Sequence, residues 1–323
     1  MSSIVGVDIA KHSFDIATLQ ANGKYRTKSK LTNEATGFET FQQWLDKYAE
    51  PGAWVVMEAT GVYHEVLAEH LHQLGYRVCV MNPAQIASYA QSQLQRVKTD
   101  RVDAKLIADY GRRHRDKLRA WQPEPLAVRR LRALVRRLDD LKEIEQMELN
   151  RLDVSHVSVQ DSIRSVLQHV QEQIADTLKA IQDHIDNDPD LRSKRDLLVS
   201  IDGIGDKTAA LLLAELGDPL GFKSARAITA FAGLNPKLQD SGKHKGHVVI
   251  SRMGSARLRS GLYMPAVAAM IHNPAIKALK ERLQARGKAG KQIVCAAMRK
   301  LLHIAYGVLK SGEPFDIQKA LAR

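Results

Sequence analysis

The sequence predicts an α/β domain with a mixed sheet, followed by a helical hairpin and a mostly helical C-terminal domain. Short β-type runs alternate with amphipathic helical stretches up to residue 81, which is typical of a sheet covered by helices. From Asp100 onward, apolar residues recur at helical spacing, and over 126–185 the spacing is close to heptad. We therefore expect three parts, at residues 1–125, 126–190 and 191–323.

The first domain follows in order from its apolar patterns. Two β-type runs flank the turn at 10–13, and Asn22-Gly23 marks a second turn before a third strand. Phe38, Phe41 and Trp44 share one face of a helix, and a short apolar run then ends at Glu58. The predicted strands lie at 4–9, 14–20, 25–31, 54–57 and 77–81, and the predicted helices at 36–48 and 63–74.

The second half of the chain is predicted from helical periodicity. Leu131, Leu134, Leu138 and Leu141 give the heptad-like pattern of a long antiparallel hairpin or coiled coil, which closes at 187–190. A helix, a Gly-Ile-Gly turn and a second helix follow, and an amphipathic helix over 291–306 packs near the C-terminus.

Composition and charge limit the function classes. The chain is 44% hydrophobic and 26% charged, as globular proteins are, and its net charge of +12 favours a polyanionic partner. We expect nucleic acid ahead of an anionic membrane, although a merely basic housekeeping protein also fits. No apolar run has the length of a membrane span, no secretory signal is visible, and cysteines number two, so we expect no membrane partner and a cytoplasmic location.

Basic residues cluster in two stretches. Residues 96–137 hold fourteen Lys and Arg against five Asp and Glu, and residues 237–259 hold six against one. Solvated helix faces more often interleave the two signs, so we predict nucleic-acid backbone contacts here. The predicted contacts include Arg129, Arg130, Arg132, Arg136 and Arg137.

Four acidic residues form the predicted catalytic and metal site. Asp8 and Glu58 each end an apolar strand, where a carboxylate is costly unless it binds a cation or hydrogen bonds. Asp100 and Asp103 share one face of a helix through their i, i+3 spacing. If the strand ends and the helix meet, four carboxylates converge and can hold two Mg²⁺ ions, with Mn²⁺ as a substitute, for phosphoryl transfer.

Each of these residues also has an ordinary structural interpretation. Asp100 could cap a helix, Asp103 could favour its first turn, Asp8 could serve a turn, and Glu58 could cap the next helix. The joint pattern of a strand Asp, a strand Glu and a helical Asp-x-x-Asp is more specific than any one residue.

This order and spacing resemble RuvC-like nucleases of the ribonuclease-H fold. More closely, the chain resembles the DEDD transposases of the IS-110 insertion-sequence family, which are bridge-RNA-guided recombinases. The motifs that carry the resemblance are Gly6-Val-Asp8-Ile-Ala-Lys11 through Phe14-Asp-Ile-Ala17, Met57-Glu58-Ala-Thr-Gly61, and Lys98-Thr-Asp100-Arg-Val-Asp103-Ala-Lys105. The resemblance extends over essentially the full length, with every acidic position present.

The resemblance implies a Mg²⁺-dependent recombinase that moves an insertion sequence between donor and target DNA. A structured guide RNA would choose both DNAs by base pairing, and dimers would pair into a tetramer, because strand exchange joins two DNA molecules. The enzyme would act in the bacterial cytoplasm, at the nucleoid when active.

The C-terminal domain holds the remaining candidates. Gly203 and Gly205 resemble a helix-hairpin-helix turn that lets the backbone approach a DNA phosphate, and a plain helix-turn-helix packing unit fits equally well. By resemblance, Ser241 is the nucleophile, forms a covalent phosphoserine and is activated by the carboxylate-held metals. Ser251 and Ser255 are competitors within the chain. The basic neighbours expected to hold a phosphodiester are Lys243, His244, Lys245 and Arg252.

Three other functions compete with the recombinase. A RuvC-type junction resolvase or nuclease would use water as the nucleophile, and Ser241 would be incidental. A sugar-kinase or actin-like ATPase also opens with Gly-Val-Asp-Ile, but the Asp-x-x-Asp motif is unexplained there. A non-catalytic helical nucleic-acid-binding protein would tolerate loss of the four carboxylates.

Overall fold

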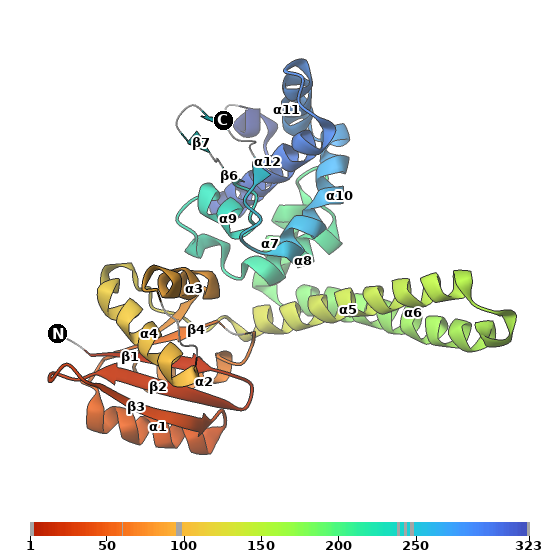
Figure 1. The fold of residues 1–323 in the computed structure, drawn as a ribbon. Coiled ribbons are helices and arrows are strands. Elements are labelled where there is room, and N and C mark those ends of the chain that lie inside the picture. The colour runs from red at the N-terminus through yellow and green to blue at the C-terminus, as the bar shows by residue number, and fades with distance from the viewer. Residues whose placement is uncertain are drawn as a thin grey trace. The chain divides into compact units, whose positions relative to one another are not determined.

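The computed structural model describes residues 3–59, 61–94, 99–237, 240–241, 244–245 and 249–321, with the backbone alone at 240–241, 244–245 and 321. It divides into two compact units, Met1–Pro123 (unit 1) and Glu124–Arg323 (unit 2). The predicted helical hairpin belongs to unit 2 (Figure 1). The division into three parts stays a prediction.

Unit 1 contains a five-stranded mixed sheet, as predicted. The strand order is β3-β2-β1-β4-β5, in which β1 pairs antiparallel with β2 and parallel with β4. Each observed strand overlaps a predicted one, with ends shifted by at most one residue. The strands are β1 (Ile4–Ile9), β2 (Ser13–Leu19), β3 (Tyr25–Thr32), β4 (Trp54–Glu58) and β5 (Arg77–Met81).

Helices cover both faces of this sheet (Figure 1). On one face, α1 (Ala35–Tyr48) and α2 (Glu65–Gln73) bury aromatic and aliphatic side chains against Val5, Val7 and their neighbours. On the other face, α3 (Pro83–Ser92) and α4 (Asp100–Arg113) pack on Ile4 and Val56. The sheet therefore separates two cores.

Two helices in unit 1 differ from the prediction, one in its boundaries and one in its existence. The helix expected over 63–74 begins at Glu65, because Gly61 has a left-handed φ of 54° and the chain turns there. Helix α3, which follows the predicted strand at 77–81, was not predicted. Asn82 in fact starts α3, because its side chain accepts a hydrogen bond from Ala84 N and Pro83 occupies the first turn.

Helix α4 lies unusually close to the sheet. A Cβ atom at Gly6 would lie 2.3 Å from the Ala104 carbonyl oxygen and 2.4 Å from the Ala108 nitrogen. A Cβ at Gly111 would lie 2.9 Å from methyl carbons of Ile4 and Val56. The two glycines allow backbone contact between helix and sheet, and this contact fixes the position of the first turn of α4 over β1.

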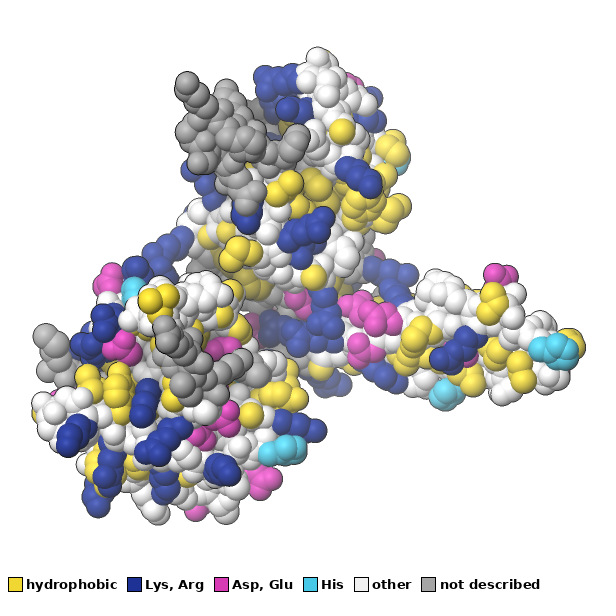
Figure 2. All heavy atoms as spheres, in the orientation of Figure 1, with side chains coloured by type: hydrophobic (Ala, Val, Ile, Leu, Met, Phe, Trp, Pro, Cys, Tyr) yellow, Lys and Arg dark blue, Asp and Glu magenta, His cyan; other side chains and the backbone are white. Residues whose placement is uncertain are grey.

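Unit 2 begins with the predicted antiparallel hairpin. Helices α5 (Leu126–Val154) and α6 (Val157–Asp186) are joined by Ser155 and His156. Leu131, Leu138 and Leu141 are buried, as their spacing predicted. Figure 2 shows that, on the face in view, the hairpin carries basic, acidic and apolar side chains together.

The rest of unit 2 is a helical core with small strands. As predicted, this part is mostly helical, and four two-residue strands that were not predicted lie between 236 and 250. The helices are α7 (Pro189–Val199), α8 (Asp206–Leu216), α9 (Ala225–Phe231), α10 (Ala256–His272), α11 (Pro274–Ala285), α12 (Gly290–Ser311) and α13 (Ile317–Leu321). The strands are β6 (Pro236–Lys237), β7 (Asp240–Ser241), β8 (His244–Lys245) and β9 (Val249–Ile250).

Helix α12 is the central helix of this core. It extends the predicted 291–306 helix to residues 290–311, and its apolar side chains are buried against α9 and α10 among others. Within the described ranges, α12 alone is long and apolar enough to cross a membrane by length and composition, and 61% of its most apolar stretch is buried in the protein.

Candidate active site

Asp8 lies on the sheet face that carries α3 and α4. Side chains alternate between faces along a strand, and Ile4 belongs to the core under α3 and α4, while Val5 and Val7 belong to the core under α1 and α2. Asp8 therefore shares a face with Ile4 and Gly6, beneath α4. It is half-buried near the end of β1.

Glu58 reaches the same face from the neighbouring strand. β1 and β4 run parallel, with Val7 opposite Met57, so the next residues in this register are Asp8 and Glu58. Val56 packs under α3 and α4, and Glu58, two residues further along β4, points to the same face because side chains alternate. The carboxyl ends of two adjacent parallel strands thus carry an acid each, on one face.

Helix α4 supplies the other two acids from its first turn. Thr99 caps the helix, with its side chain accepting a hydrogen bond from Val102 N, so Asp100 is the first helical residue rather than the cap. Asp103 immediately precedes Ala104, which contacts Gly6 of β1. Asp100 is exposed and Asp103 is half-buried. The helix N-terminus also favours acidic side chains here.

The pKa of Asp8 shows that the other three acids lie near enough to act on it electrostatically. Partial burial, followed in order of size by the charges of Asp103, Asp100, Glu58 and Asp15, raises the pKa of Asp8 from 3.8 to about 7. Such mutual repulsion is what a bound cation relieves.

Asp15 is a fifth carboxylate near this site that the sequence analysis did not select. It lies directly opposite Asp8 in the antiparallel β1–β2 pair and also raises the pKa of Asp8. Asp15 is buried, and its Oδ1 accepts a hydrogen bond of 2.8 Å from Lys30 N. Asp15 could have been selected from the hairpin predicted at 4–20, because the register of that hairpin places Asp8 and Asp15 across from each other.

Asn33 is a second residue that the sequence analysis missed. Its Nδ2 atom donates to the carbonyl oxygen of Ala10 at 3.3 Å and to that of Tyr63 at 3.0 Å. Ala10 follows β1 and Tyr63 follows β4, so Asn33 ties together the two segments that leave Asp8 and Glu58. No sequence signal marks this role, because it depends on three segments meeting.

The donor chemistry of the site suits a hard divalent cation. Mg²⁺ prefers oxygen ligands and usually keeps several waters, so it needs only a few carboxylates. Within the described residues, no group of three or more His, Cys, Asp or Glu lies close enough to hold a metal ion. The four acids therefore lie on one side of the sheet, and three of them raise the pKa of Asp8, without forming a closed cage.

The predicted arginine cluster on α5 divides into two groups. Arg132 forms an ion pair with Glu124 and donates to the Ala214 carbonyl at 2.7 Å, and Arg136 lies 3.7 Å from Glu215. These two side chains link α5 to residues of α8 inside unit 2. Arg130 and Arg137 are exposed, and Arg129 is half-buried.

Gly203 and Gly205 differ in their surroundings. Gly203 has a φ of 101°, and a Cβ there would lie 2.6 Å from the Ala269 Cβ, so helix packing alone requires glycine. Gly205 caps α8, and a Cβ there would meet nothing within 4 Å. Only Gly205 therefore leaves open space at the N-terminus of α8.

The candidates after residue 236 are only partly described. Ser241 pairs with His244 in the β7–β8 ladder, and the side chains of Ser241, His244 and Lys245 lie outside the description, as does Lys243. Arg252 is exposed, with a φ of 55°. Of the competing serines, Ser255 caps α10 and donates to Glu215 at 3.1 Å.

Comparison with known proteins gives matches in both units. A DEDD transposase model of the IS110 group matches residues 5–154, and a model described as "Transposase IS116/IS110/IS902 family" matches residues 195–281. The first range contains Asp8, Glu58, Asp100 and Asp103, and the second contains Ser241.

Individual relatives match along the whole chain. A pilin gene-inverting protein of Moraxella bovis is 35% identical over 317 residues, which cover 97% of each chain, and that of Moraxella lacunata is 34% identical over the same length. A transposase for insertion sequence element IS1328 of Yersinia enterocolitica is 25% identical, over 97% of this chain and 98% of its own. With its acids, its fold and these matches in agreement, the chain belongs to the IS-110 family of transposases.

Proposed function

We propose that the chain is a recombinase that cuts and rejoins DNA through a covalent serine linkage, with divalent metal held by Asp8, Glu58, Asp100 and Asp103 in a RuvC-like unit 1. The observation that carries this proposal is that Asp8 and Glu58 end adjacent parallel strands on the sheet face covered by α4, whose first turn carries Asp100 and Asp103. A protein that only bound DNA would gain nothing from placing repelling acids together, whereas a DEDD transposase depends on divalent metal.

The carboxylates have a defined task in this proposal. Divalent metal, with two Mg²⁺ ions proposed, supplies Lewis-acid stabilisation of phosphate oxygens when it is bound. Asp8 and Glu58 present their oxygens from fixed strand ends, and Asp100 and Asp103 approach from the first turn of α4. Asp15 keeps its hydrogen bond to Lys30 N and adds negative charge beside Asp8.

Ser241 is the proposed nucleophile. Its hydroxyl oxygen forms a bond to a DNA phosphorus and one P–O bond of the DNA breaks. The proton that the serine loses is balanced by the proton that the leaving oxygen gains, so a strand end with a free hydroxyl remains. Attack by that hydroxyl, or by one from another strand, reverses the step and releases the serine. The linkage conserves bond energy, so strands can be exchanged without another energy source.

A structured guide RNA and a tetramer of paired dimers complete the proposal. The support here is the similarity of the sequence motifs to the IS-110 family. Recombination at two DNA sites also fits the names of relatives that invert a pilin gene or move an insertion sequence. Exposed Arg130, Arg137 and Arg252, open Gly205 and the basic residues at 243–245 are the proposed backbone contacts.

Covalent trapping tests this proposal. The protein is expressed from its native locus with flanking DNA and Mg²⁺, then denatured, and DNA attached to protein is measured. Ser241→Ala and Asp100→Ala are expected to abolish the adduct. Ser260→Ala, an exposed serine on α10, and Asp116→Asn, an exposed acid of unit 1, are the matched controls that keep it.

Two results would overturn the serine mechanism. Metal-dependent cleavage without an adduct, unchanged in Ser241→Ala, indicates a hydrolytic RuvC-type nuclease. Unchanged recombination in Asp100→Ala removes the carboxylate site from the reaction.

A further inference from the structure

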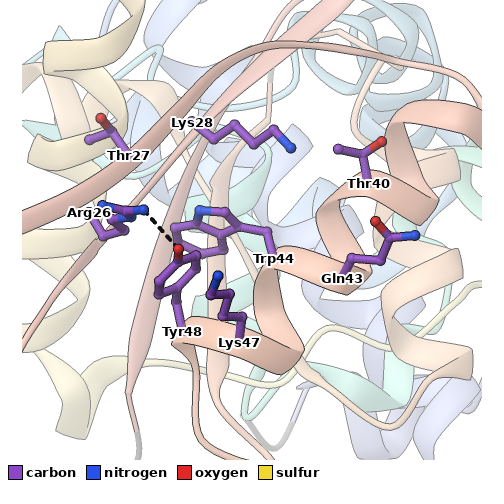
Figure 3. A pocket seen from close by; sticks show the side chains of 8 residues that line it. All are labelled: Arg26, Thr27, Lys28, Thr40, Gln43, Trp44, Lys47 and Tyr48. Carbon is purple, nitrogen blue, oxygen red and sulfur yellow. Dashed lines mark hydrogen bonds between the residues drawn. The ribbon is translucent and has the colours of Figure 1, made fainter.

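An open recess lies between the edge strand β3 and helix α1 in unit 1. Its volume is about 410 Å³, and Figure 3 shows side chains from both elements arranged around it. We call it the β3–α1 recess. Its lining consists of Arg26, Thr27, Lys28, Thr40, Gln43, Trp44, Lys47 and Tyr48.

The recess is on the opposite sheet face from the carboxylates. Arg26 pairs with Thr18 and Lys28 with Ile16, and Ile16 belongs to the core under α1 and α2. Since alternate residues share a face, Arg26 and Lys28 lie on the α1 side. Asp8 lies on the α4 side, so this recess is separate from the site already described.

The lining of the recess is cationic. Arg26, Lys28 and Lys47 all border it, its described lining includes no acidic residue, and none of the three forms an ion pair within the described part of the chain. By contrast, a second recess on unit 2 is lined by both Arg192 and Asp196. Figure 2 shows basic side chains spread over the region that Figure 1 labels β3 and α1.

The contacts around Tyr48 make the recess favourable for an anion. Arg26 donates a 2.8 Å hydrogen bond to the Tyr48 hydroxyl, and its guanidinium lies 4.7 Å from the ring centroid (Figure 3). Burial opposes ionisation of Tyr48, yet the hydrogen bond and charge of Arg26, with the charge of Lys47, lower its pKa. The hydroxyl oxygen thus accepts a hydrogen bond from Arg26 and lies in a positive potential. Gln43 adds a further donor from α1, whereas the Thr40 hydroxyl already donates to the Thr36 carbonyl oxygen at 2.9 Å.

We propose that the β3–α1 recess binds a backbone phosphate of the DNA on which this transposase acts. Three cations and the amide of Gln43 match the charge and oxygen chemistry of a phosphodiester. An open recess admits a polymer that continues past it, and the lining contains no acidic side chain to exclude a polyanion. Such contacts fix the position of DNA without reading its sequence. The inference goes beyond the proposed function and requires only a DNA-acting chain, not Ser241 or the metals.

A charge-removal experiment tests the recess. Affinity for a labelled DNA duplex is measured against salt concentration, with a chelator present, for the triple variant Arg26→Gln, Lys28→Gln, Lys47→Gln. The matched control, Lys277→Gln, Arg286→Gln, Lys288→Gln, removes the same charge from exposed positions on and after α11. Tryptophan fluorescence melting verifies folding, and the single variant Lys28→Gln replaces the triple if the triple is unfolded.

We expect the recess triple to bind about tenfold more weakly and to lose about 1 from the slope of log affinity against log salt, because one phosphate contact contributes about 0.9. Equal losses in both triples, or no loss in either, overturn the proposal. A loss confined to a single-stranded RNA of the same sequence assigns the recess to RNA and overturns the DNA assignment. Inorganic tripolyphosphate is also added as a competitor. If it displaces DNA equally from the wild type and both triple variants, the recess is not a specific phosphate site.

The outcome is independent of covalent trapping. An adduct with unchanged DNA binding in the recess triple rejects the recess alone. Weakened binding together with no adduct in the wild type supports the recess and rejects the serine mechanism.

Discussion

At Asp8, burial and neighbouring negative charges both raise the pKa of the carboxyl group. Partial burial disfavours the carboxylate, and four nearby acids oppose its charge, so the pKa rises to about 7. The ionised form of Asp8 is therefore destabilised in the metal-free protein, and a bound divalent cation would stabilise it.

Replacing Asp8 should therefore change how stability depends on pH. Between about pH 4 and 7, the folded protein holds a proton that the unfolded chain has lost, so wild-type stability falls as pH rises through this window. In metal-free protein, we expect Asp8→Asn to melt about 4–8 °C higher than the wild type at pH 8, a figure that allows for solvent screening of a partly exposed group. The difference should shrink towards pH 4.

Fluorescence-monitored melting at several pH values, with a chelator, checks this expectation. Asp116→Asn removes the same charge from an exposed position and serves as the control. A difference between Asp8→Asn and wild type that stays constant with pH would contradict it.

Asn33 offers a test of positioning rather than of chemistry. Asn33→Ala removes the two hydrogen bonds that hold Ala10 and Tyr63, and we expect a stability loss of about 1–3 kcal/mol. Cleavage should slow by about tenfold while DNA affinity is kept, because Asp8 and Glu58 lose their fixed spacing. Asn22→Ala, in the β2–β3 turn, is the matched control, and equal rates in the two variants would reject a positioning role.

The limits of sequence reasoning are clearest at single residues. Asp8, Glu58, Asp100 and Asp103 were selected because each follows from a strand end or a helical spacing, and the structure brings them to one face. Arg132 was assigned to nucleic acid from its local charge run, but Ala214, which accepts its hydrogen bond, is 82 residues away. Local sequence carries no information about such a partner.

Among the elements, β1 and α4 set the geometry of the site through backbone contact. The strand was predicted from its apolar run and the helix from its periodicity, and both were found. Their close approach at Gly6 could not be predicted, because a glycine in a strand indicates close packing only when the opposing element is known.

Gly6→Ala tests this contact. The added methyl group would meet backbone atoms of Ala104 and Ala108, so α4 must move away from the sheet, at a cost of about 1–3 kcal/mol. We expect cleavage to fall at least about tenfold, since Asp100 and Asp103 move with α4. Urea unfolding and cleavage assays measure both effects. Gly307→Ala in α12, with nothing within 4 Å of the new Cβ, should be neutral or stabilising. Full activity in Gly6→Ala would show that the contact is dispensable.

At the scale of the whole molecule, the proposed metal site and the helical core belong to different units. All three tryptophans, Trp44, Trp54 and Trp121, lie in unit 1, and most helices lie in unit 2. Tryptophan fluorescence therefore reports on unit 1, while far-ultraviolet circular dichroism is dominated by unit 2.

Adding Mg²⁺ should stabilise one unit selectively. A ligand that binds only the folded state at ten times its dissociation constant stabilises by about 1.4 kcal/mol. We expect the fluorescence transition to move to higher temperature with Mg²⁺ while the dichroism transition moves little, and we expect Asp8→Asn to reduce the shift. Equal shifts of both transitions, or a full shift in Asp8→Asn, would contradict a metal site at these acids.

The edge strand β3 has a consequence for self-association. Its outer side leaves backbone groups that could pair with the same strand of a second molecule. Arg26, Lys28 and Lys30 give that edge a single sign of charge, and Lys30, with its φ of 57°, interrupts the regular strand. Two such edges repel each other. Exchanging these basic residues for β-branched apolar ones should therefore produce aggregates detectable by light scattering, so the same charges keep concentrated protein dispersed.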